Sequence, residues 1–318
     1  MLAPQQLVRL RKISRDEPPV MTVESGATVH LDLPDFSGGL INQKSVASDL
    51  KAIDFSKGYA LAGPIRVKGA KAGNILEVEF LRFSNKGWGY TAIFPDVEVK
   101  DLANYPEERF EPFIVKWDVM GAFAHWRKFG VRVPLNPFLG VVGTAPRMGG
   151  SFNPLPPRDC GGNLDVKHLV AGSRLYLPVN VDGADLFVGD PHLAMGDGEV
   201  YSSAIEAPLE AEFRVRVRDA ADHIEPPMCV VPNSSVHKAY DRGSIGFMGV
   251  AKTLDEACEI ASRKAMTYFC GKLGMTPAEA AILLGVVLDL TISEVPDLPN
   301  KVVMGMVPLS VFQGDVLP

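Results

Sequence analysis

The chain has 318 residues, of which 47% are hydrophobic and 22% charged, a composition typical of a folded globular protein and not of a disordered or fibrous one. Its formal net charge of -6 predicts no basic surface, so neither nucleic acid nor an anionic membrane is expected as a partner. The first sixteen residues lack the apolar core of a secretion signal, and no apolar run approaches the roughly 20 residues of a bilayer span. The 4 cysteines show no C-x-x-C spacing, which indicates reduced thiols and a cytoplasmic location.

Short apolar runs separated by glycine fill the chain from about residue 20 to residue 133. Strands are predicted over 29–33, 63–67 and 74–81, because these segments alternate polar and apolar residues or are rich in β-branched ones. This pattern favours a mainly β fold, either sandwich-like or barrel-like. His30 and His125 belong to no recognisable motif and are predicted to be structural.

Prolines and glycines dominate residues 134–172. Such a stretch in a compact protein is usually a linker or an ordered functional loop. Because it leads directly into Asn163 and Asp165, we expect a loop around the mouth of a site. The segment 143–151 contains glycines but lacks the order of a phosphate-binding loop.

Acid/base and metal-binding side chains are densest between Cys160 and Glu206. The apolar run 186–188 predicts a buried strand, and Asp190 and His192 would leave its end on the same face because side chains repeat every second residue. An isolated histidine is often structural, but histidine and carboxylate oxygens together are the usual ligands of zinc and similar divalent metals. The spacing matches no short metal-binding motif.

A turn around Asp197, flanked by glycines, predicts that the strand folds back on itself. The returning arm is predicted as strand over 200–206 and then 210–217. Asp197 also fits a purely structural role in the turn. The hairpin, joined by one residue of the preceding loop, would gather the following side chains: Asp190, His192, Asp197, Glu199 and Asp165.

The pattern changes after about residue 230. Thr253 begins a capping box that predicts a helix through about Leu273, ended by Gly274. A second capping box predicts another helix over 276–287. Strands are expected at 246–250, 288–292 and 302–307. We therefore expect a β-rich domain over 1–230 that carries the site loops, and a smaller α+β domain over 231–318 packed against it.

Two segments carry a family resemblance. Gly161-Gly162-Asn163-Leu164-Asp165 and the segment 189–199, GDPHLAMGDGE, strongly resemble the acetamidase/formamidase family, whose pattern reads GGN-x-D followed by GD-x-H-x-x-Q-GDGE. The resemblance extends to 35–39, 63–70 and 137–146, and so it covers most of the chain in order. It implies hydrolysis of a carboxamide to a carboxylic acid and ammonia, a divalent metal such as zinc, and a homodimer.

Under this resemblance, Asp165, His192 and Glu199 are the expected catalytic residues. Asp165 and His192 would bind the metal or contact its ligands, and Asp190 would join them while holding the imidazole in position. Glu199 would act as general acid/base or as a further ligand. Water activated by the metal or by a carboxylate would attack the amide.

Asn163, Asp35 and Met195 are the expected substrate-binding residues. Two positions depart from the family: Met195 replaces the glutamine of the pattern, and Tyr59 replaces a histidine or asparagine that usually precedes the Gly-Pro block. Methionine offers neither amide donors nor a carbonyl acceptor, so a larger or less polar amide, or a loss of activity, is expected. Cys160 is a conceivable nucleophile, but no base accompanies it.

Two other functions stay open from the sequence. One is a non-catalytic β-rich protein that uses the same hairpin to bind a metal or a small polar ligand. The other is a hydrolase of cyclic amides, which is chemically adjacent to the first proposal.

Overall fold

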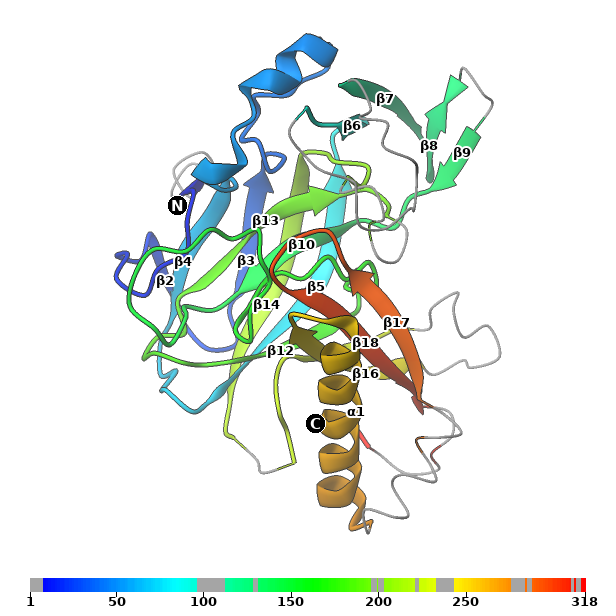
Figure 1. Ribbon diagram of the computed structural model, residues 1–318. Helices are drawn as coiled ribbons and strands as arrows, with labels where there is room; N and C mark the ends of the chain where they lie inside the picture. The colour runs from blue at the N-terminus through cyan, green and yellow to red at the C-terminus, as the bar shows by residue number, and fades with distance from the viewer. Residues whose placement is uncertain are drawn as a thin grey trace.

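Most described residues of the computed structural model lie in β-strands, which form three sheets (Figure 1). The described residues are 8–95, 112–127, 131–195, 199, 203–220, 223–232, 243–275, 284, 288–309, 312 and 316–318. Within these ranges the α-helix is α1 (Leu254–Leu273), and η2 (Ala47–Ala52) and η3 (Phe55–Lys57) are short 3-10 segments. The predicted mainly β class, with a helix in its C-terminal part, is confirmed.

The first sheet carries the site. Its strands, in spatial order, are β1 (Val8–Leu10), β4 (Leu61–Val67), β13 (Leu186–His192), β10 (Phe138–Gly143) and β11 (Gly161–Asn163), with β2 (Met21–Val23) parallel to β4. Every residue of β13 and β10 is buried. The register places Phe138 opposite His192 and Val141 opposite Asn163, so the apolar strand β10 lies between the polar ends of β13 and β11.

The loop predicted over 134–172 is wrong near its start, at Phe138–Gly143, and again at Gly161–Asn163, where the chain forms the strands β10 and β11. Phe138–Gly143 form the inner strand β10, because this run is apolar throughout and buries both faces. Pro137 and Pro146 flank the strand and lie outside it, where their missing N–H groups interrupt no ladder.

The second sheet has eight strands. They are, in spatial order, β17 (Asp289–Glu294), β18 (Lys301–Pro308), β16 (Ser244–Ala251), β15 (Met228–Val231), β12 (Arg174–Pro178), β5 (Ile75–Asn85), β14 (Leu209–Arg218) and β3 (Thr28–Leu33). These include the strands predicted around 29–33, 74–81, 210–217, 246–250, 288–292 and 302–307. β3 alternates exposed and buried residues along its whole length, as its sequence predicts.

A smaller third sheet consists of β6 (Trp88–Ile93), β7 (Phe113–Met120), β8 (Phe123–Trp126) and β9 (Val131–Pro134). His125 lies in β8 opposite Asp118 and Arg132, a position that suits the structural role predicted for it. His30 lies in β3 with its side chain 65% exposed and 3.6 Å from Glu212.

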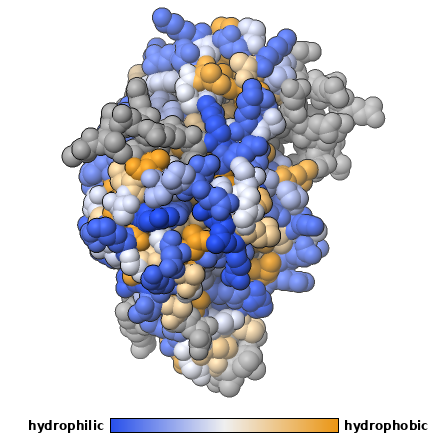
Figure 2. Space-filling model, turned by 90° about the vertical axis from the view of Figure 1, so that its left-hand side faces the viewer, coloured by the Kyte–Doolittle hydropathy of each residue, from blue (hydrophilic) through white to orange (hydrophobic). Residues whose placement is uncertain are grey.

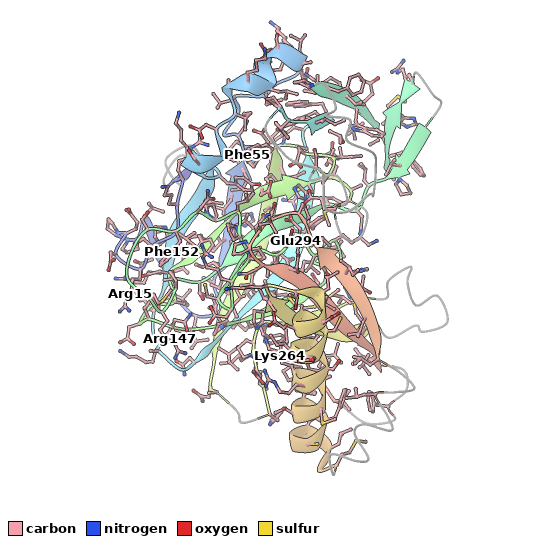
Figure 3. All side chains as sticks on the ribbon, viewed as in Figure 1. Arg15, Phe55, Arg147, Phe152, Lys264 and Glu294 are labelled. Carbon is pink, nitrogen blue, oxygen red and sulfur yellow. The ribbon has the colours of Figure 1, made fainter. Side chains whose placement is uncertain are left out.

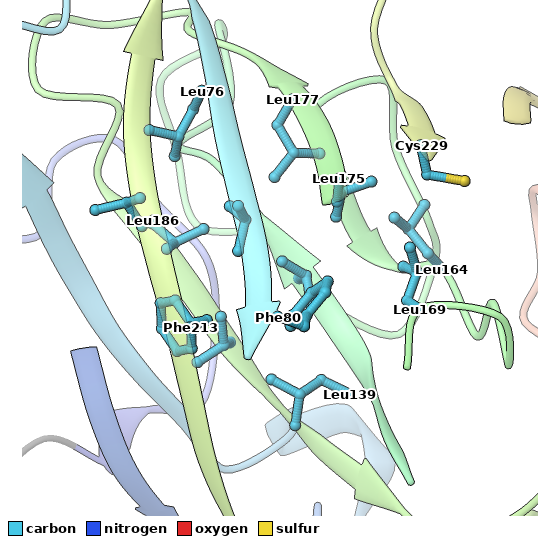
Figure 4. Close-up of a cluster of buried hydrophobic side chains, with 14 of the residues drawn as sticks. Leu76, Phe80, Leu139, Leu164, Leu169, Leu175, Leu177, Leu186, Phe213 and Cys229 are labelled. Atoms are coloured by element: carbon cyan, nitrogen blue, oxygen red, sulfur yellow. The ribbon is translucent and has the colours of Figure 1, made fainter. Parts of the chain in front are cut away.

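The main hydrophobic core draws side chains from both large sheets. Figure 4 shows Phe80 of β5 and Phe213 of β14 beside Leu139 of β10 and Leu186 of β13. Burial of such apolar side chains contributes about 1.5–3 kcal/mol each. The two sheets are therefore held together at the level of the strands that carry the site.

α1 packs on β16 and β18 (Figure 1). It begins as predicted, because the Thr253 side chain accepts a hydrogen bond from the backbone N–H of Glu256 at 3.2 Å. It also ends as predicted, at Gly274 in the left-handed conformation with φ of 66°. The second predicted helix, over 276–287, lies almost wholly outside the described residues.

The eight-stranded sheet crosses the domain boundary that the sequence suggested at residue 230. That boundary falls inside β15, which pairs with β12 on one side and β16 on the other. The division into two domains therefore stays a prediction, and any such division must cut this sheet. No helix in the described ranges combines the length and the hydrophobicity needed to cross a bilayer.

Candidate active site

Four carboxylates and one histidine converge at the end of β13, all with 8% or less of their surface exposed. Asp165, Asp190 and His192 offer three ligand atoms within 4.8 Å of one another, and His192, Glu199 and Glu206 offer a second set of the same size. The convergence of Asp165, Asp190, His192 and Glu199 that the sequence predicts is thus present. Glu206 is an addition that sequence reasoning missed.

Three carboxylates and one aromatic ring surround the imidazole of His192. Its Nε2 lies 3.3 Å from Asp190 Oδ1 and 3.2 Å from Glu206 Oε2, and its Nδ1 lies 3.9 Å from Asp165 Oδ1. Phe138, opposite it in β10, meets the ring edge-to-face at 5.0 Å. Asp190 and His192 face the same volume, as the two-residue spacing predicts.

The backbone takes unusual conformations where these carboxylates lie. Asp165, Asp190 and Glu199 have φ angles of 45°, 53° and 43°, in the left-handed region that non-glycine residues seldom occupy. Such strain costs on the order of 1–3 kcal/mol per residue and concentrates at functional sites. The backbone N–H of Asp165 donates to Gly140 O at 3.2 Å, which anchors the strained loop to β10.

Gly140 forms the floor of the cluster. A Cβ atom at this position would lie 2.4 Å from Asp165 Oδ1, 2.8 Å from Asp190 Oδ2 and 3.0 Å from His192 Cε1. The space above the Gly140 Cα is therefore bounded by all three polar side chains. Any side chain here would project into the cluster.

The two arms of the predicted hairpin meet beside β13. Leu193 N donates to Ile205 O at 2.8 Å, Ile205 N donates to Ala194 O at 2.9 Å, and an isolated bridge joins His192 to Glu206. The returning strand predicted over 200–206 is nevertheless wrong for its described part, where only the bridge at Glu206 interrupts irregular backbone. Asp197 and its flanking glycines lie outside the described residues.

Glu206 could have been suspected from its surroundings. It is a lone acid in an otherwise apolar segment, between Ile205 and Ala207, and a buried carboxylate needs a partner. Its Oε1 accepts a hydrogen bond from the backbone N–H of Ala204 at 3.1 Å, while Oε2 faces His192. No local pattern indicates which partner it would meet.

A second acidic pair comes from the C-terminal part of the chain. Asn163 Nδ2 donates to Asp297 Oδ2, and Asp297 N donates to Glu294 Oε1 at 2.6 Å. Glu294 ends β17 and is fully buried (labelled in Figure 3). Burial raises the pKa of Asp297 to about 7 and that of Glu294 to about 10. Sequence reasoning missed both residues, which lie more than 130 positions from Asn163.

The cluster contains four buried carboxyl groups but only one basic side chain, that of His192. Burial raises the pKa of Asp165 and of Glu199 well above the ordinary range, and the neighbouring carboxylates add to the effect. Burial alone would lower the pKa of His192, but Glu206 and Asp190 raise it well above its ordinary value. His192 is the strongest positive influence on Asp165, Glu199 and Glu206 alike.

Several polar atoms of the cluster have no hydrogen-bond partner. They are both carboxylate oxygens of Asp165, Oδ1 of Asn163, Oε2 of Glu206 and Nδ1 of His192. Buried polar atoms are almost always paired, so a group of unpaired ones around a single space indicates a ligand site. Carboxylate oxygens and an imidazole nitrogen suit a divalent cation.

The acetamidase/formamidase family model matches residues 5–149 and 150–314. The chain belongs to the acetamidase/formamidase family. It is 25% identical to a formamidase of Methylophilus methylotrophus over 369 residues, covering 95% of this chain and 89% of the relative.

Solved structures agree with this family membership. An acetamidase from Bacillus halodurans is 28% identical with a TM-score of 0.83, and the match covers 96% of both chains. A gamma lactamase from Delftia acidovorans is 26% identical with a TM-score of 0.60, and the match covers 97% of this chain and 90% of the other.

The expected substrate-binding residues lie in different settings. Asp35 is buried, and its carboxylate accepts hydrogen bonds from Ser37 Oγ at 2.7 and 2.9 Å, from Gly39 N at 2.9 Å and from Tyr90 Oη at 2.5 Å. These bonds anchor its loop and position Tyr90, and a direct contact with substrate stays a prediction. Met195 is half-buried just beyond β13, and its contact with substrate also stays a prediction.

Cys160 does not have the properties of a nucleophile. It is fully buried, and burial raises its pKa to about 12, so its reactive thiolate form is absent at neutral pH. It immediately precedes β11 (Gly161–Asn163) in the chain. The sequence-based preference for a carboxylate and histidine site over a cysteine site is consistent with this setting.

Proposed function

We propose that this protein hydrolyses small linear carboxamides to a carboxylic acid and ammonia, with a divalent cation held at the end of β13. The observation that carries the proposal is the convergence of Asn163, Asp165, His192 and Glu199, from the two segments that match the family pattern, around one space with unpaired polar atoms. The formamidase and acetamidase relatives support the reaction class.

The donor set fits a divalent cation. Asp165 has two unpaired oxygens, and the unpaired Nδ1 of His192 faces it while Nε2 faces Asp190 and Glu206. A histidine that binds a metal commonly directs its other ring nitrogen to a carboxylate in this way. We infer that Asp165, His192 and Asp190 hold the cation and that Glu206 orients the imidazole; zinc is the ion that this mixture of ligands suits best.

A divalent cation supplies Lewis-acid chemistry, since it withdraws charge from a carbonyl oxygen and makes a water molecule more acidic. The side chains of the protein supply the remaining roles. Asn163 already donates through Nδ2 to Asp297, which leaves its Oδ1 to accept an N–H of the substrate amide and orient it.

Glu199 has the properties of the proton carrier. Burial and the neighbouring Asp165 raise its pKa, which favours the protonated carboxyl over the carboxylate. A protonated carboxyl can deliver its proton to the departing nitrogen, and the carboxylate that remains can accept a proton from water in the next cycle. Delivery matters because an amide nitrogen leaves as ammonia only after it gains a proton.

The proposal is tested by ammonia release from formamide, acetamide and propionamide, measured before and after treatment with a chelator and after zinc is restored. We expect turnover that the chelator abolishes and zinc restores. Glu199→Gln should lower kcat by about 100-fold or more. Glu24→Gln is the matched control, because Glu24 is 70% exposed, pairs with Lys68 and does not belong to the acidic cluster. Turnover by Glu199→Gln equal to that of the unaltered protein contradicts the assigned role.

A second candidate reaction is hydrolysis of a cyclic amide, which the similarity to the Delftia acidovorans gamma lactamase favours. Opening of a lactam releases no ammonia, because nitrogen stays in the product. The panel should therefore include 2-pyrrolidone, with the amino acid product measured directly. Bound metal without turnover of any amide would instead favour a non-catalytic binding protein.

The cytoplasmic location and the homodimer stay predictions, and light scattering tests the dimer.

A further inference from the structure

A cleft of about 1120 Å³ lies on the side of the molecule that carries the N-terminal strands, where hydrophilic side chains predominate (Figure 2). Charged side chains such as those of Arg11, Glu17 and Lys57 line it, and none of its lining residues belongs to the acidic cluster. The cleft is therefore separate from the cluster, and discrimination between reacting groups falls to the side chains around the cluster itself.

Asn163 lies beside the cluster at the end of β11. Its segment is anchored to the floor of the cluster, because the backbone N–H groups of Leu164 and Asp165 both donate to Gly140 O, at 2.9 and 3.2 Å. Asn163 itself pairs with Val141, the next residue of β10. Asn163 is 1% exposed, and its Oδ1 has no hydrogen-bond partner. A buried acceptor without a partner is suited to an N–H of a ligand.

The other end of the Asn163 carboxamide is bound by Asp297. Asn163 Nδ2 donates to Asp297 Oδ2, and both side chains are buried. A carboxylate only accepts hydrogen bonds, so it selects the NH2 end of the amide and leaves Oδ1 at the opposite end. The contact with Asp297 therefore determines which atom of Asn163 is left to meet a ligand.

Asp297 is itself held in place by hydrogen bonds. It lies in the connection 295–300 between β17 and β18 (Figure 1). Its backbone N–H donates to Oε1 of the buried Glu294 at 2.6 Å. Asn300 Nδ2 donates at 2.6 Å to the carbonyl oxygen of Pro157, in the segment that precedes β11. These bonds fix the loop against the segment that leads to Asn163, and a connected network of this kind is rigid.

Without Asp297 the carboxamide of Asn163 is expected to turn round. The nearby cluster contains acceptors that have no partner, which are both carboxylate oxygens of Asp165 and Oε2 of Glu206. A buried NH2 group that loses its acceptor carries a full desolvation penalty until it finds another one. The NH2 group of Asn163 would then face the cluster in place of Oδ1.

We propose that Asp297 is a positioning residue that makes this protein prefer amides to esters, because it holds Asn163 with Oδ1 toward the substrate. The inference rests on the proposed function. In this orientation Asn163 accepts an N–H of a substrate amide. An ester has only an acceptor oxygen at that place, and its lone pairs would meet those of Oδ1. A site built to hydrogen-bond an N–H strongly rejects an analogue that lacks it.

The first arm of the test compares kcat/KM for acetamide and methyl acetate, which share the acetyl group, by release of acetate from the full-length protein. The assays are run at pH 8, because burial raises the pKa of Asp297 to about 7 and the ionised form is the one that only accepts. Asp297→Leu removes the acceptor and keeps a side chain of similar size. We expect the acetamide-to-methyl acetate ratio of kcat/KM to fall at least about tenfold.

The ratio separates a positioning role from a structural one. Partial unfolding or loss of a bound metal slows both substrates alike and leaves the ratio unchanged, so an unchanged ratio in Asp297→Leu overturns the inference. Leu298→Ala is the matched control, because Leu298 is 58% exposed in the same loop. We expect this control to keep the ratio of the unaltered protein.

The second arm exchanges the two residues in one protein, Asn163→Asp with Asp297→Asn. The NH2 group then lies at position 297 and donates back to position 163, where the second carboxylate oxygen still accepts the substrate N–H. We expect the ratio to stay within about threefold of that of the unaltered protein, because the two changes compensate for each other. A ratio as low as that of Asp297→Leu overturns the inference, since the Asp297 carboxylate would then act by itself and not through Asn163.

The third arm measures binding in Glu199→Gln, in which slow turnover is expected. Saturation-transfer NMR gives the Kd of acetamide and of methyl acetate. We expect acetamide to bind at least about tenfold more tightly, and Asp297→Leu in the same background to remove most of the difference. Equal binding of the two compounds overturns the inference whatever the activity measurements show. A binding difference in a protein that releases no acetate from acetamide contradicts the proposed function and leaves the role of Asp297 standing.

Discussion

Gly140→Ala is the smallest change that tests the geometry of the site. The added methyl carbon would lie 2.4 Å from Asp165 Oδ1, 2.8 Å from Asp190 Oδ2 and 3.0 Å from His192 Cε1. Gly140 is not among the residues with positive φ, so alanine fits the backbone of β10 without strain. The effect of the substitution is therefore confined to the side chains that it displaces.

The size of the effect follows from these distances. Ordinary contact of a Cβ atom begins near 3.4 Å, so the Asp165 carboxylate must move by about 1 Å. A displacement of this size in a catalytic group lowers the rate by about 100-fold. The cost to folding should be modest, about 1–3 kcal/mol, as for other small insertions into packed interiors.

The assay combines kcat/KM for ammonia release, metal content by elemental analysis and the thermal unfolding midpoint. Gly149→Ala is the control, because Gly149 is exposed and its nearest neighbour to a new Cβ is Asp16 Oδ2 at 3.9 Å. We expect Gly149→Ala to behave as the unaltered protein. A Gly140→Ala protein with kcat/KM within threefold of normal and full metal content would refute the assignment of this space to the cation and the reacting amide.

Three further substitutions test separate parts of the reasoning. Asp165→Asn should lower kcat by about 100-fold or more and remove the shift in thermal midpoint on adding zinc. It should nevertheless stabilise the chelated protein, because it removes a carboxyl group whose ionised form is disfavoured by burial. Lys264→Met should raise the free energy of unfolding, because burial lowers the pKa of Lys264 to about 8. Between pH 8 and pH 10.5 the unfolded chain holds a proton on Lys264 that the folded chain lacks, so the stability of the unaltered protein rises with pH over this range. The gain should reach about 3 kcal/mol at pH 7 and vanish above pH 10.5, as measured by urea unfolding. Met195→Gln should raise kcat/KM for acetamide by about 10-fold if residue 195 contacts the amide, and unchanged kcat/KM argues against that contact.

Local patterns were enough to place the centre of the site. The two-residue period after an apolar run put Asp190 and His192 on one face, and the same rule governs the pleat of β13. The capping box at Thr253 and the glycine at 274 bounded α1 correctly, because caps act through hydrogen bonds between near neighbours. Rules of this kind need no knowledge of the rest of the chain.

Contacts between distant segments were out of reach. Asp297 meets Asn163 only because the eight-stranded sheet carries β17 and β18 to the edge of the site, and no local period encodes that arrangement. Glu206 escaped notice for a related reason, since irregular backbone carries it to His192 where a regular strand was expected. The prolines around β10 suggested a loop, although they mark where an inner strand begins and ends.

The burial of the cluster itself argues for a ligand. An isolated charge taken from water into a protein interior costs several kcal/mol, and attraction to one imidazole cannot offset this cost for Asp165, Asp190, Glu199 and Glu206 together. Without a cation the carboxyls can avoid the cost only by holding protons, which is the direction of the raised pKa values of Asp165 and Glu199. A divalent cation removes the conflict and binds the folded chain in preference to the unfolded one, so it stabilises the fold by mass action. The proposed function and the stability of the fold would then depend on the same group of side chains, and cation binding would compensate for the strained backbone at Asp165 and Asp190.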